Sequence, residues 1–198
     1  MPNRRLAPGR RRSALLDAGE ELFRARAFDD VSMQDIADHA GVTRALLYHY
    51  FGSKGEFFGA IWERVHERLL AADTAPAPTI RGWVENLLRS YLEFYMANLP
   101  LVVIANRSSV SDDPAVRGPV DRTFAALCAS VLDAAGATGR PRAVAEVGFE
   151  GWIAFVRESS LATYLDGRLS DEENLALCMD VLDAAVGRHV DLGAPPHV

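Results

Sequence analysis

The chain has 198 residues, of which 49% are apolar and 24% charged, and its net charge is −6 at pH 7. This composition is typical of a globular protein and excludes a disordered or fibrous chain. No stretch approaches the roughly 18 uninterrupted apolar residues of a membrane span, and the basic N-terminus lacks the apolar segment of a secretory signal. We therefore expect a cytoplasmic protein with no membrane partner.

Residues that could hold a metal are few and scattered. Cys128 and Cys178 are the two cysteines, and both lie in apolar periodic runs, as expected of small buried side chains in a reducing compartment. Together with the five histidines they form no zinc-binding spacing. We expect no metal and no cofactor.

Charge is distributed unevenly along the chain. Residues 1–54 carry nine basic and seven acidic side chains, whereas residues 74–198 carry ten basic and sixteen acidic ones. A basic end on an acidic body favours a partner that is a polyanion, although a solvated tail would have the same composition. Residues 1–12 form this basic arm, with Arg4, Arg5, Arg10, Arg11 and Arg12.

Every long segment after the arm has a helical period, and strand alternation is not sustained anywhere, so the chain is predicted to be all-α. A proline-rich linker at 74–78 is the best domain boundary and divides residues 13–73 from residues 79–198. Nine helices are expected: 13–26, 32–40, 44–50, from 53 to the linker, 79–98, 100–110, 119–136, 141–166 and 170–187.

Capping residues fix several helix ends. Ser32, Ser53 and Ser170 are each followed three residues later by an acid, which is the spacing of a capping box. Gly41 stands where a left-handed residue ends a helix, and Thr43 can cap the helix that follows.

Residues 32–51 contain two short helices joined by a tight turn, which is the layout of a helix-turn-helix. Leu46 and Leu47 are expected to face the core. The outward positions are then an arginine, a methyl group, a phenol and an imidazole, which suit base edges and phosphates. An ordinary helical hairpin remains the alternative for this pattern alone. The four outward residues are Arg44, Ala45, Tyr48 and His49.

From Arg11 to about Trp62 the sequence closely resembles the DNA-binding domain of the TetR family of bacterial transcriptional regulators. Two positions depart from the family's pattern. Ala27 replaces a common glycine, at a cost of about 1 kcal/mol if a left-handed residue is needed, and Gly55 replaces an acid. The resemblance is carried by Leu15–Ala18, Leu22–Phe23, Phe28, Val31–Met33, Ile36–Ala37, Ala40–Thr43, Leu46–Phe51, Ser53–Lys54 and Phe58.

The resemblance implies a nine-helix dimer whose N-terminal helix-turn-helix binds a palindromic operator in double-stranded DNA. It also implies an effector cavity among the fifth to eighth helices, although core packing is the commoner role of any one aromatic. The implied DNA contacts are Ser32, Gln34, Thr43, Arg44, Ala45, Tyr48, His49 and Lys54. The expected pocket wall is Trp83, Tyr91, Tyr95, Phe124, Trp152 and Phe155, with Asn98, Asn106 and Arg107 as polar anchors or solvent-exposed residues.

A homodimer interface is expected on the last two helices, paired as a four-helix bundle. The alternative is that these apolar faces are buried within one chain. The expected interface residues are Val156, Leu175, Cys178, Val181, Leu182 and Ala185.

These observations together predict a transcriptional regulator, a repressor released from its operator by a small apolar or amphipathic ligand. Two alternatives stay open: the same fold without a small-molecule switch, and a helical interaction module that does not bind DNA. An enzyme is not expected. Glu146 and Glu150 are one turn apart, but no third ligand or nucleophile stands at a useful spacing.

Overall fold

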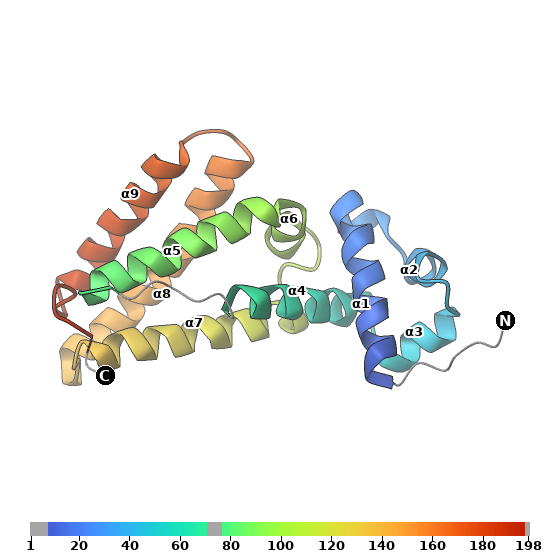
Figure 1. The fold of residues 1–198 in the computed structure, drawn as a ribbon, viewed down its shortest axis with the longest axis horizontal. Coiled ribbons are helices and arrows are strands. Elements are labelled where there is room, and N and C mark those ends of the chain that lie inside the picture. The colour runs from blue at the N-terminus through green and yellow to red at the C-terminus, as the bar shows by residue number, and fades with distance from the viewer. Residues whose placement is uncertain (1–7, 71–76, 197–198) are drawn as a thin grey trace. The chain divides into compact units, whose positions relative to one another are not determined.

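The computed structural model describes residues 8–70 and 77–196, and within those ranges the chain forms nine α-helices and no strand (Figure 1). The all-α prediction is confirmed. Arg4, Arg5 and most of the expected linker lie outside the described residues. The helices are α1 (Pro8–Ala25), α2 (Met33–His39), α3 (Arg44–Tyr50), α4 (Lys54–Leu70), α5 (Ile80–Ala97), α6 (Leu99–Arg107), α7 (Pro114–Ala134), α8 (Gly139–Tyr164) and α9 (Asp171–Leu182).

The chain forms two compact units that do not follow the expected division at the linker. The first contains Met1–Arg68 and Asn98–Val120, and the second contains Leu69–Ala97 and Asp121–Val198. Helix α6 and the start of α7 therefore fold with the N-terminal helices. A functional effector domain over residues 79–198 stays a prediction.

Two helices, α1 and α7, begin five residues earlier than expected. Helix α1 starts at Pro8, so Arg10, Arg11 and Arg12 are helical. Helix α7 starts at Pro114 because Asp113 Oδ1 accepts the N–H of Ala115 at 2.9 Å. Pro119, expected as the start, lies inside the helix.

Aromatic side chains fill the first unit. Phe23 on α1 packs on the rings of Phe28 at 5.7 Å and Phe58 at 5.4 Å. Gly19 has no room for a larger residue, because a Cβ there would clash with the ring of Phe57. This close packing of α1 on α4 supports the two short helices between them.

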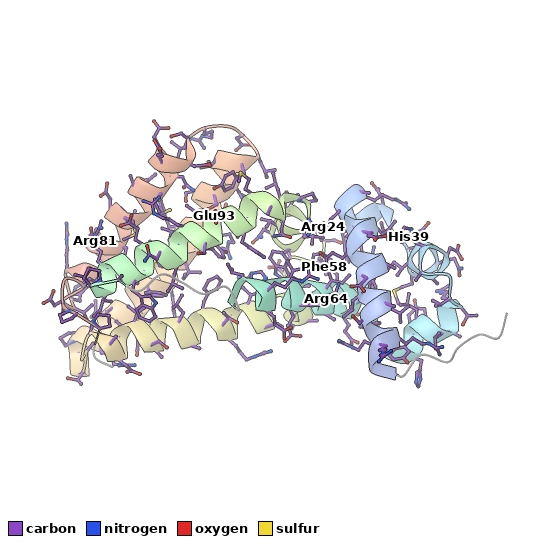
Figure 2. The ribbon with its side chains drawn as sticks, in the orientation of Figure 1. Arg24, His39, Phe58, Arg64, Arg81 and Glu93 are labelled. Atoms are coloured by element: carbon purple, nitrogen blue, oxygen red, sulfur yellow. The ribbon has the colours of Figure 1, made fainter. Side chains whose placement is uncertain are left out.

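An ionic cluster joins α1 to α4 at the edge of this core. Glu20, whose side chain is 12% exposed, accepts hydrogen bonds from Arg24, Arg64 and Arg68 at 2.9–3.1 Å. Figure 2 labels Arg24 and Arg64 at this junction. Although burial opposes ionisation, the three guanidinium groups lower the pKa of Glu20 to about 2. Arg24 also donates to Asn98 Oδ1 at 2.6 Å and so ties α1 to the start of α6.

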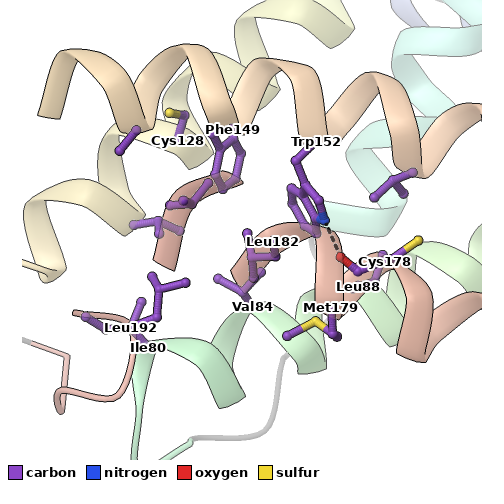
Figure 3. Packing of buried hydrophobic residues seen from close by; sticks show 14 of the residues in the cluster. Ile80, Val84, Leu88, Cys128, Phe149, Trp152, Cys178, Met179, Leu182 and Leu192 are labelled. Carbon is purple, nitrogen blue, oxygen red and sulfur yellow. Dashed lines mark hydrogen bonds between the residues drawn. The ribbon is translucent and has the colours of Figure 1, made fainter. Parts of the chain in front are cut away.

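The second unit has a core contributed by α5, α7, α8 and α9 (Figure 3). The C-terminal segment closes it: the carbonyls of Ala194 and Leu192 accept the N–H groups of Ile80 and Arg81, which are the first two of α5. Because these N–H groups have no partner within a helix, the tail acts as the cap of α5.

No single helix among the described residues is long and apolar enough to span a membrane; α5 and α6 reach the required length and hydropathy only together.

Candidate nucleic-acid interface

Helix α2 begins with the expected capping box. Ser32 Oγ accepts the N–H of Asp35 at 3.1 Å, and the Asp35 carboxylate accepts the N–H of Ser32 at 2.8 Å. The hydroxyl of Ser32 also donates to this carboxylate, and these bonds lower the pKa of Asp35. Both residues are therefore engaged in holding the first turn of α2.

The turn between α2 and α3 is tight, as expected. Gly41 has φ +64°, a conformation that a side chain disfavours, and the N–H of Val42 bonds back to the carbonyl of Ala37 at 2.9 Å. Thr43 then caps α3, because its hydroxyl accepts the N–H of Leu46 at 3.2 Å. Local bonds thus set the direction of α3.

Helix α3 presents one side to solvent. Leu47 is fully buried, while Leu46, expected to face the core as well, is only half-buried. The guanidinium of Arg44 lies 5.3 Å from the ring centroid of Tyr48 and 3.4 Å from its hydroxyl. The outward residues are the expected ones, because Arg44, Ala45, Tyr48 and His49 are all exposed.

The two remaining residues expected to contact DNA, Gln34 and Lys54, differ in their exposure to solvent and in their hydrogen bonds. Gln34 is exposed at the start of α2, with its amide donating to Asp38 at 2.8 Å. Lys54 is half-buried, and its ammonium donates to the carbonyls of Phe28 and Val31, both at 2.8 Å. This ammonium is bonded to two backbone carbonyls within the chain, and its contact with a phosphate stays a prediction.

The sequence interpretation missed one ordered cation. The guanidinium of Arg12 lies 5.2 Å from the ring centroid of Phe51, the residue that ends α3. Arg12 belongs to the expected basic arm, whereas helix α1 holds it beside the C-terminal end of α3. Pro8 at the first helical position is the signal that could have extended the helix back over these arginines.

Both departures from the family pattern have a structural explanation. Ala27 adopts φ −63° and ψ 147°, so no left-handed residue is needed there and the expected cost does not arise. Gly55 lies against Asp113, and a Cβ at this position would clash with that carboxylate.

The residues expected to line an effector pocket fall into two groups. Tyr91 has Tyr95 and Phe124 close by, with ring centroids at 4.7 and 5.7 Å, and burial beside Tyr95 raises the pKa of Tyr91 well above its usual range. Trp152 is instead a core residue, 3% exposed, whose indole N–H donates to the carbonyl of Cys178 at 2.7 Å (Figure 3). Trp83 and Phe155 are half-buried against the same core.

The three candidate anchors are not equivalent. Asn98 accepts from Arg24, as described above. The amide of Asn106 donates to the carbonyl of Val102 at 2.8 Å within its own helix. Arg107 is exposed.

Most of the expected dimer residues are buried within the chain's own core, and the dimer interface itself stays a prediction. Four of the six are buried within the chain's own core and have no surface to offer a partner. The other two, Val181 and Ala185, are half-buried against that core. Helical period located the apolar face correctly, but that face packs inward on α5 and α8. The four buried residues are Val156, Leu175, Cys178 and Leu182.

A buried polar network joins α8 to α9, and sequence reasoning did not find it. Asn174, which is fully buried, lies with its amide 3.5 Å from Ser160 Oγ and with its carbonyl oxygen 3.7 Å from Cys178 Sγ. Ser159 Oγ lies 3.3 Å from the same sulfur. Each of these groups has a partner, as buried polar groups require.

Sequence comparison with known proteins matches the N-terminal helices of the chain. Residues 15–61 match the family model described as "Bacterial regulatory proteins, tetR family". The transcriptional activator FasR of Mycolicibacterium smegmatis is 39% identical over 67 residues, which are 34% of this chain and 31% of that protein. The matched segment thus spans about a third of that relative's length.

Solved structures extend the likeness to the whole fold. A tetR-family transcriptional regulator from Streptomyces coelicolor superposes with a TM-score of 0.71 at 22% identity, over 90% of this chain and 80% of that one. The regulator FadR of Bacillus subtilis, solved with stearoyl-CoA, gives 0.57 at 14% identity, over 88% and 97% of the two chains. The fold and the exposed α3 define an all-α chain with an N-terminal helix-turn-helix. Residues 15–61 have the sequence of a TetR-family helix-turn-helix segment, and the fold of the whole chain is that of the solved tetR-family regulators.

Proposed function

We propose that this protein is a dimeric regulator that binds operator DNA through α3 and is released by a small apolar or amphipathic ligand. The observation that carries the DNA-binding part is the outward side of α3. Arg44 and Tyr48 stand exposed on a short helix that a tight turn and a side-chain cap hold in place. Such a helix fits the major groove, and an arginine near its start suits a guanine edge. A regulator of bacterial DNA would act in the cytoplasm.

The test uses fluorescence anisotropy with DNA from the promoter next to the gene and a scrambled duplex of equal length. We expect the protein to prefer the promoter fragment, and Arg44→Ala to reduce that preference. Arg140→Ala is the matched control, because Arg140 is exposed on α8 and its loss changes the net charge equally. Equal binding to both duplexes by the unaltered protein would contradict the proposal.

A palindromic operator calls for two copies of α3 about 34 Å apart, and therefore for a dimer. Since the faces first expected are buried, we assign the dimer contact to the apolar side chains that α8 and α9 leave exposed. Val147 is 68% exposed and Leu177 is 39% exposed. Gly151 has open space around its Cβ position, which permits close approach of another helix. Val147→Glu and Leu177→Glu should convert the dimer to monomers in light scattering, whereas Arg140→Glu should not.

The ligand switch is proposed for the half-buried rings of Tyr91 and Phe124; Tyr91 packs in turn on the buried ring of Tyr95. FadR, which shares the fold, was solved with an acyl-CoA. Stearoyl-CoA and palmitate are therefore the first probes for release of labelled operator. Phe124→Ala should weaken release, while Leu127→Ala, a half-buried change on the same helix, should leave it intact.

One observation favours the same fold without a small-molecule switch. Trp152 and Tyr95, two of the six expected wall residues, are 3% and 1% exposed, so they contribute to packing. On that alternative, no ligand copurifies in native mass spectrometry and no probe releases the operator. Repression would follow from a dimer that covers promoter DNA. A reporter gene under that promoter measures whether the protein represses or activates transcription.

A further inference from the structure

Helix α7 carries the chain from one compact unit into the other. Residues up to Val120 belong to the unit that contains the helix-turn-helix, and residues from Asp121 onward belong to the unit that contains α8 and α9. The other crossings lie near helix ends, in the last turn of α4 and between α5 and α6. In α7, by contrast, the boundary falls in the interior of a long helix.

The start of α7 is seated on α4 within the first unit. Gly55 and Gly59 lie one helical turn apart on α4, and neither leaves room for a side chain. A Cβ at Gly59 would clash with the carbonyl of Ala115, and one at Gly55 would clash with the carboxylate of Asp113. Val116, in the first turn of α7, is buried as well. This end of α7 is therefore packed as part of the helix-turn-helix unit.

The far end of α7 is fixed in the second unit, whereas its middle has little support. Cys128, Val131 and Leu132 are buried in the core that α5, α8 and α9 share. Between the two ends, none of residues 117–127 is buried, and each is half-buried or exposed. Because most helical stability in proteins comes from tertiary packing, the backbone bonds of this middle segment should open more readily than those of the far end.

Two residues weaken the helix at the start of this segment. Gly118 and Pro119 stand side by side inside α7, and glycine and proline are the residues with the lowest helix propensity. Proline has no N–H, so the carbonyl of Ala115 lacks the bond that a regular helix would give it. The same carbonyl lies against Gly59 of α4. Pro119 thus removes a bond from α7 at a point where the preceding turn is held by another helix.

We infer that Gly118 and Pro119 form a hinge on which the helix-turn-helix unit pivots against the rest of the chain. The start of α7 moves with α4, and the buried end of α7 stays with the second core. Phe124, one of the rings proposed to meet a ligand, lies in the weakly supported segment directly after the hinge. The inference rests on the proposed function only in its consequence for DNA binding, since the hinge is a property of the free protein.

The first experiment needs no DNA and follows hydrogen exchange by mass spectrometry on the full chain. Peptides covering 120–127 and 128–134 report on two parts of the same helix. We expect the first to exchange at least about tenfold faster, and Pro119→Ala, which supplies an N–H for the carbonyl of Ala115, to reduce this ratio. The ratio is the readout because a change in global stability slows both peptides.

Pro114→Ala is the matched control for this experiment. Pro114 is the first residue of the same helix, where a missing N–H costs no helical bond. The ratio should therefore stay as in the unaltered protein. Equal exchange of the two peptides in the unaltered protein would overturn the inference, and so would a ratio that Pro119→Ala leaves unchanged or that Pro114→Ala changes equally.

The second experiment measures how well the protein adapts to the spacing of its half-sites. One base pair inserted at the centre of the promoter site rotates one half-site by about 35° relative to the other. A dimer whose DNA-binding units pivot follows this rotation better than a stiffened one. We expect Pro119→Ala to match the unaltered protein on the original fragment and to bind the respaced fragment about tenfold more weakly than the unaltered protein does. Pro114→Ala should match the unaltered protein on both.

Equal affinity of all three proteins for the respaced fragment would overturn this second expectation, as would a loss in Pro119→Ala that is the same on both fragments. The two proposals fail separately. If the unaltered protein prefers no promoter fragment, the proposed function fails, and the exchange ratio still decides whether the hinge exists. If promoter preference is intact but the two peptides of α7 exchange alike, the hinge fails and the function stands.

Discussion

The α2–α3 pair and the α8–α9 pair are both two helices joined by a short connection, but they place their polar side chains oppositely. On α3, Arg44, Tyr48 and His49 point to solvent. Between α8 and α9, Asn174 and Ser160 are fully buried, and the amide of Asn174 on α9 donates to the hydroxyl of Ser160 on α8. Polar groups that are satisfied inside the chain are not available to a partner, whereas exposed ones on a rigid helix are. The difference separates the surface for which we propose DNA binding from a pair of helices that supports the fold.

The largest expected effect is on the buried side of this comparison. Trp152→Ala removes a core side chain and its bond to Cys178 O, and should lower the free energy of unfolding by about 3–5 kcal/mol. Trp152→Phe keeps most of the apolar volume and should cost only about 1–2 kcal/mol, for the lost indole hydrogen bond. Chemical denaturation measures both. A Trp152→Ala protein of unaltered stability that no longer responds to a ligand would make Trp152 a pocket residue after all.

Substitution of an exposed residue on α3 should change DNA binding and leave stability unaltered. Arg44→Ala should cost about 1–3 kcal/mol of binding free energy on the cognate site, relax preference at one base pair, and leave stability unchanged. Anisotropy titrations on single-base variants of the operator measure it. An equal loss on cognate and scrambled DNA would make Arg44 a phosphate contact, and the proposed readout of bases by this helix would then be wrong.

A third effect tests the ionic cluster that holds α1 against α4. The pKa of Glu20 is lowered from 4.5 to about 2. Because the folded-state pKa is depressed, the stabilisation is present above about pH 4.5 and is lost as pH falls toward 2. The full shift corresponds to about 3 kcal/mol, which solvent around the half-exposed Arg68 reduces to roughly 1–2 kcal/mol.

Glu20→Gln should therefore be less stable than the unaltered protein at pH 7 and converge with it near pH 2. Melting curves at a series of pH values provide the measurement. Asp17→Asn is the control, since Asp17 is exposed and bonded to Arg64 alone within the same cluster. A stability difference that persists unchanged at low pH would mean that the carboxylate's charge is not the source.

The smallest effect concerns the cap of α3. Thr43→Ala leaves the N–H of Leu46 without its side-chain acceptor and should cost about 1 kcal/mol, while Thr43→Ser should be nearly neutral. Operator affinity should follow the same order, because the first turn of α3 carries Arg44. If Thr43→Ser loses affinity as strongly as alanine, the methyl group and not the cap supports binding.

The sequence by itself determined the features whose causes lie within a few residues. Ser32 with Asp35, Gly41 and Thr43 form caps and a turn over distances of three or four positions, so the helix-turn-helix and its outward residues could be predicted. Helical period likewise gave nine helices and the apolar side of each. Helix starts were less certain, as α1 and α7 show, because a proline suits either the first turn or, with one bond lost, the interior.

Only the tertiary structure decided which partner each face meets. The apolar side of α9 looked the same whether another chain or its own core would cover it, and the fold places Cys178 and Leu182 inside. Glu20 finds Arg64 and Arg68 more than forty residues away, and Lys54 finds two carbonyls more than twenty residues before it. Such contacts have no local signature, because period and capping describe one helix at a time while packing brings distant helices together.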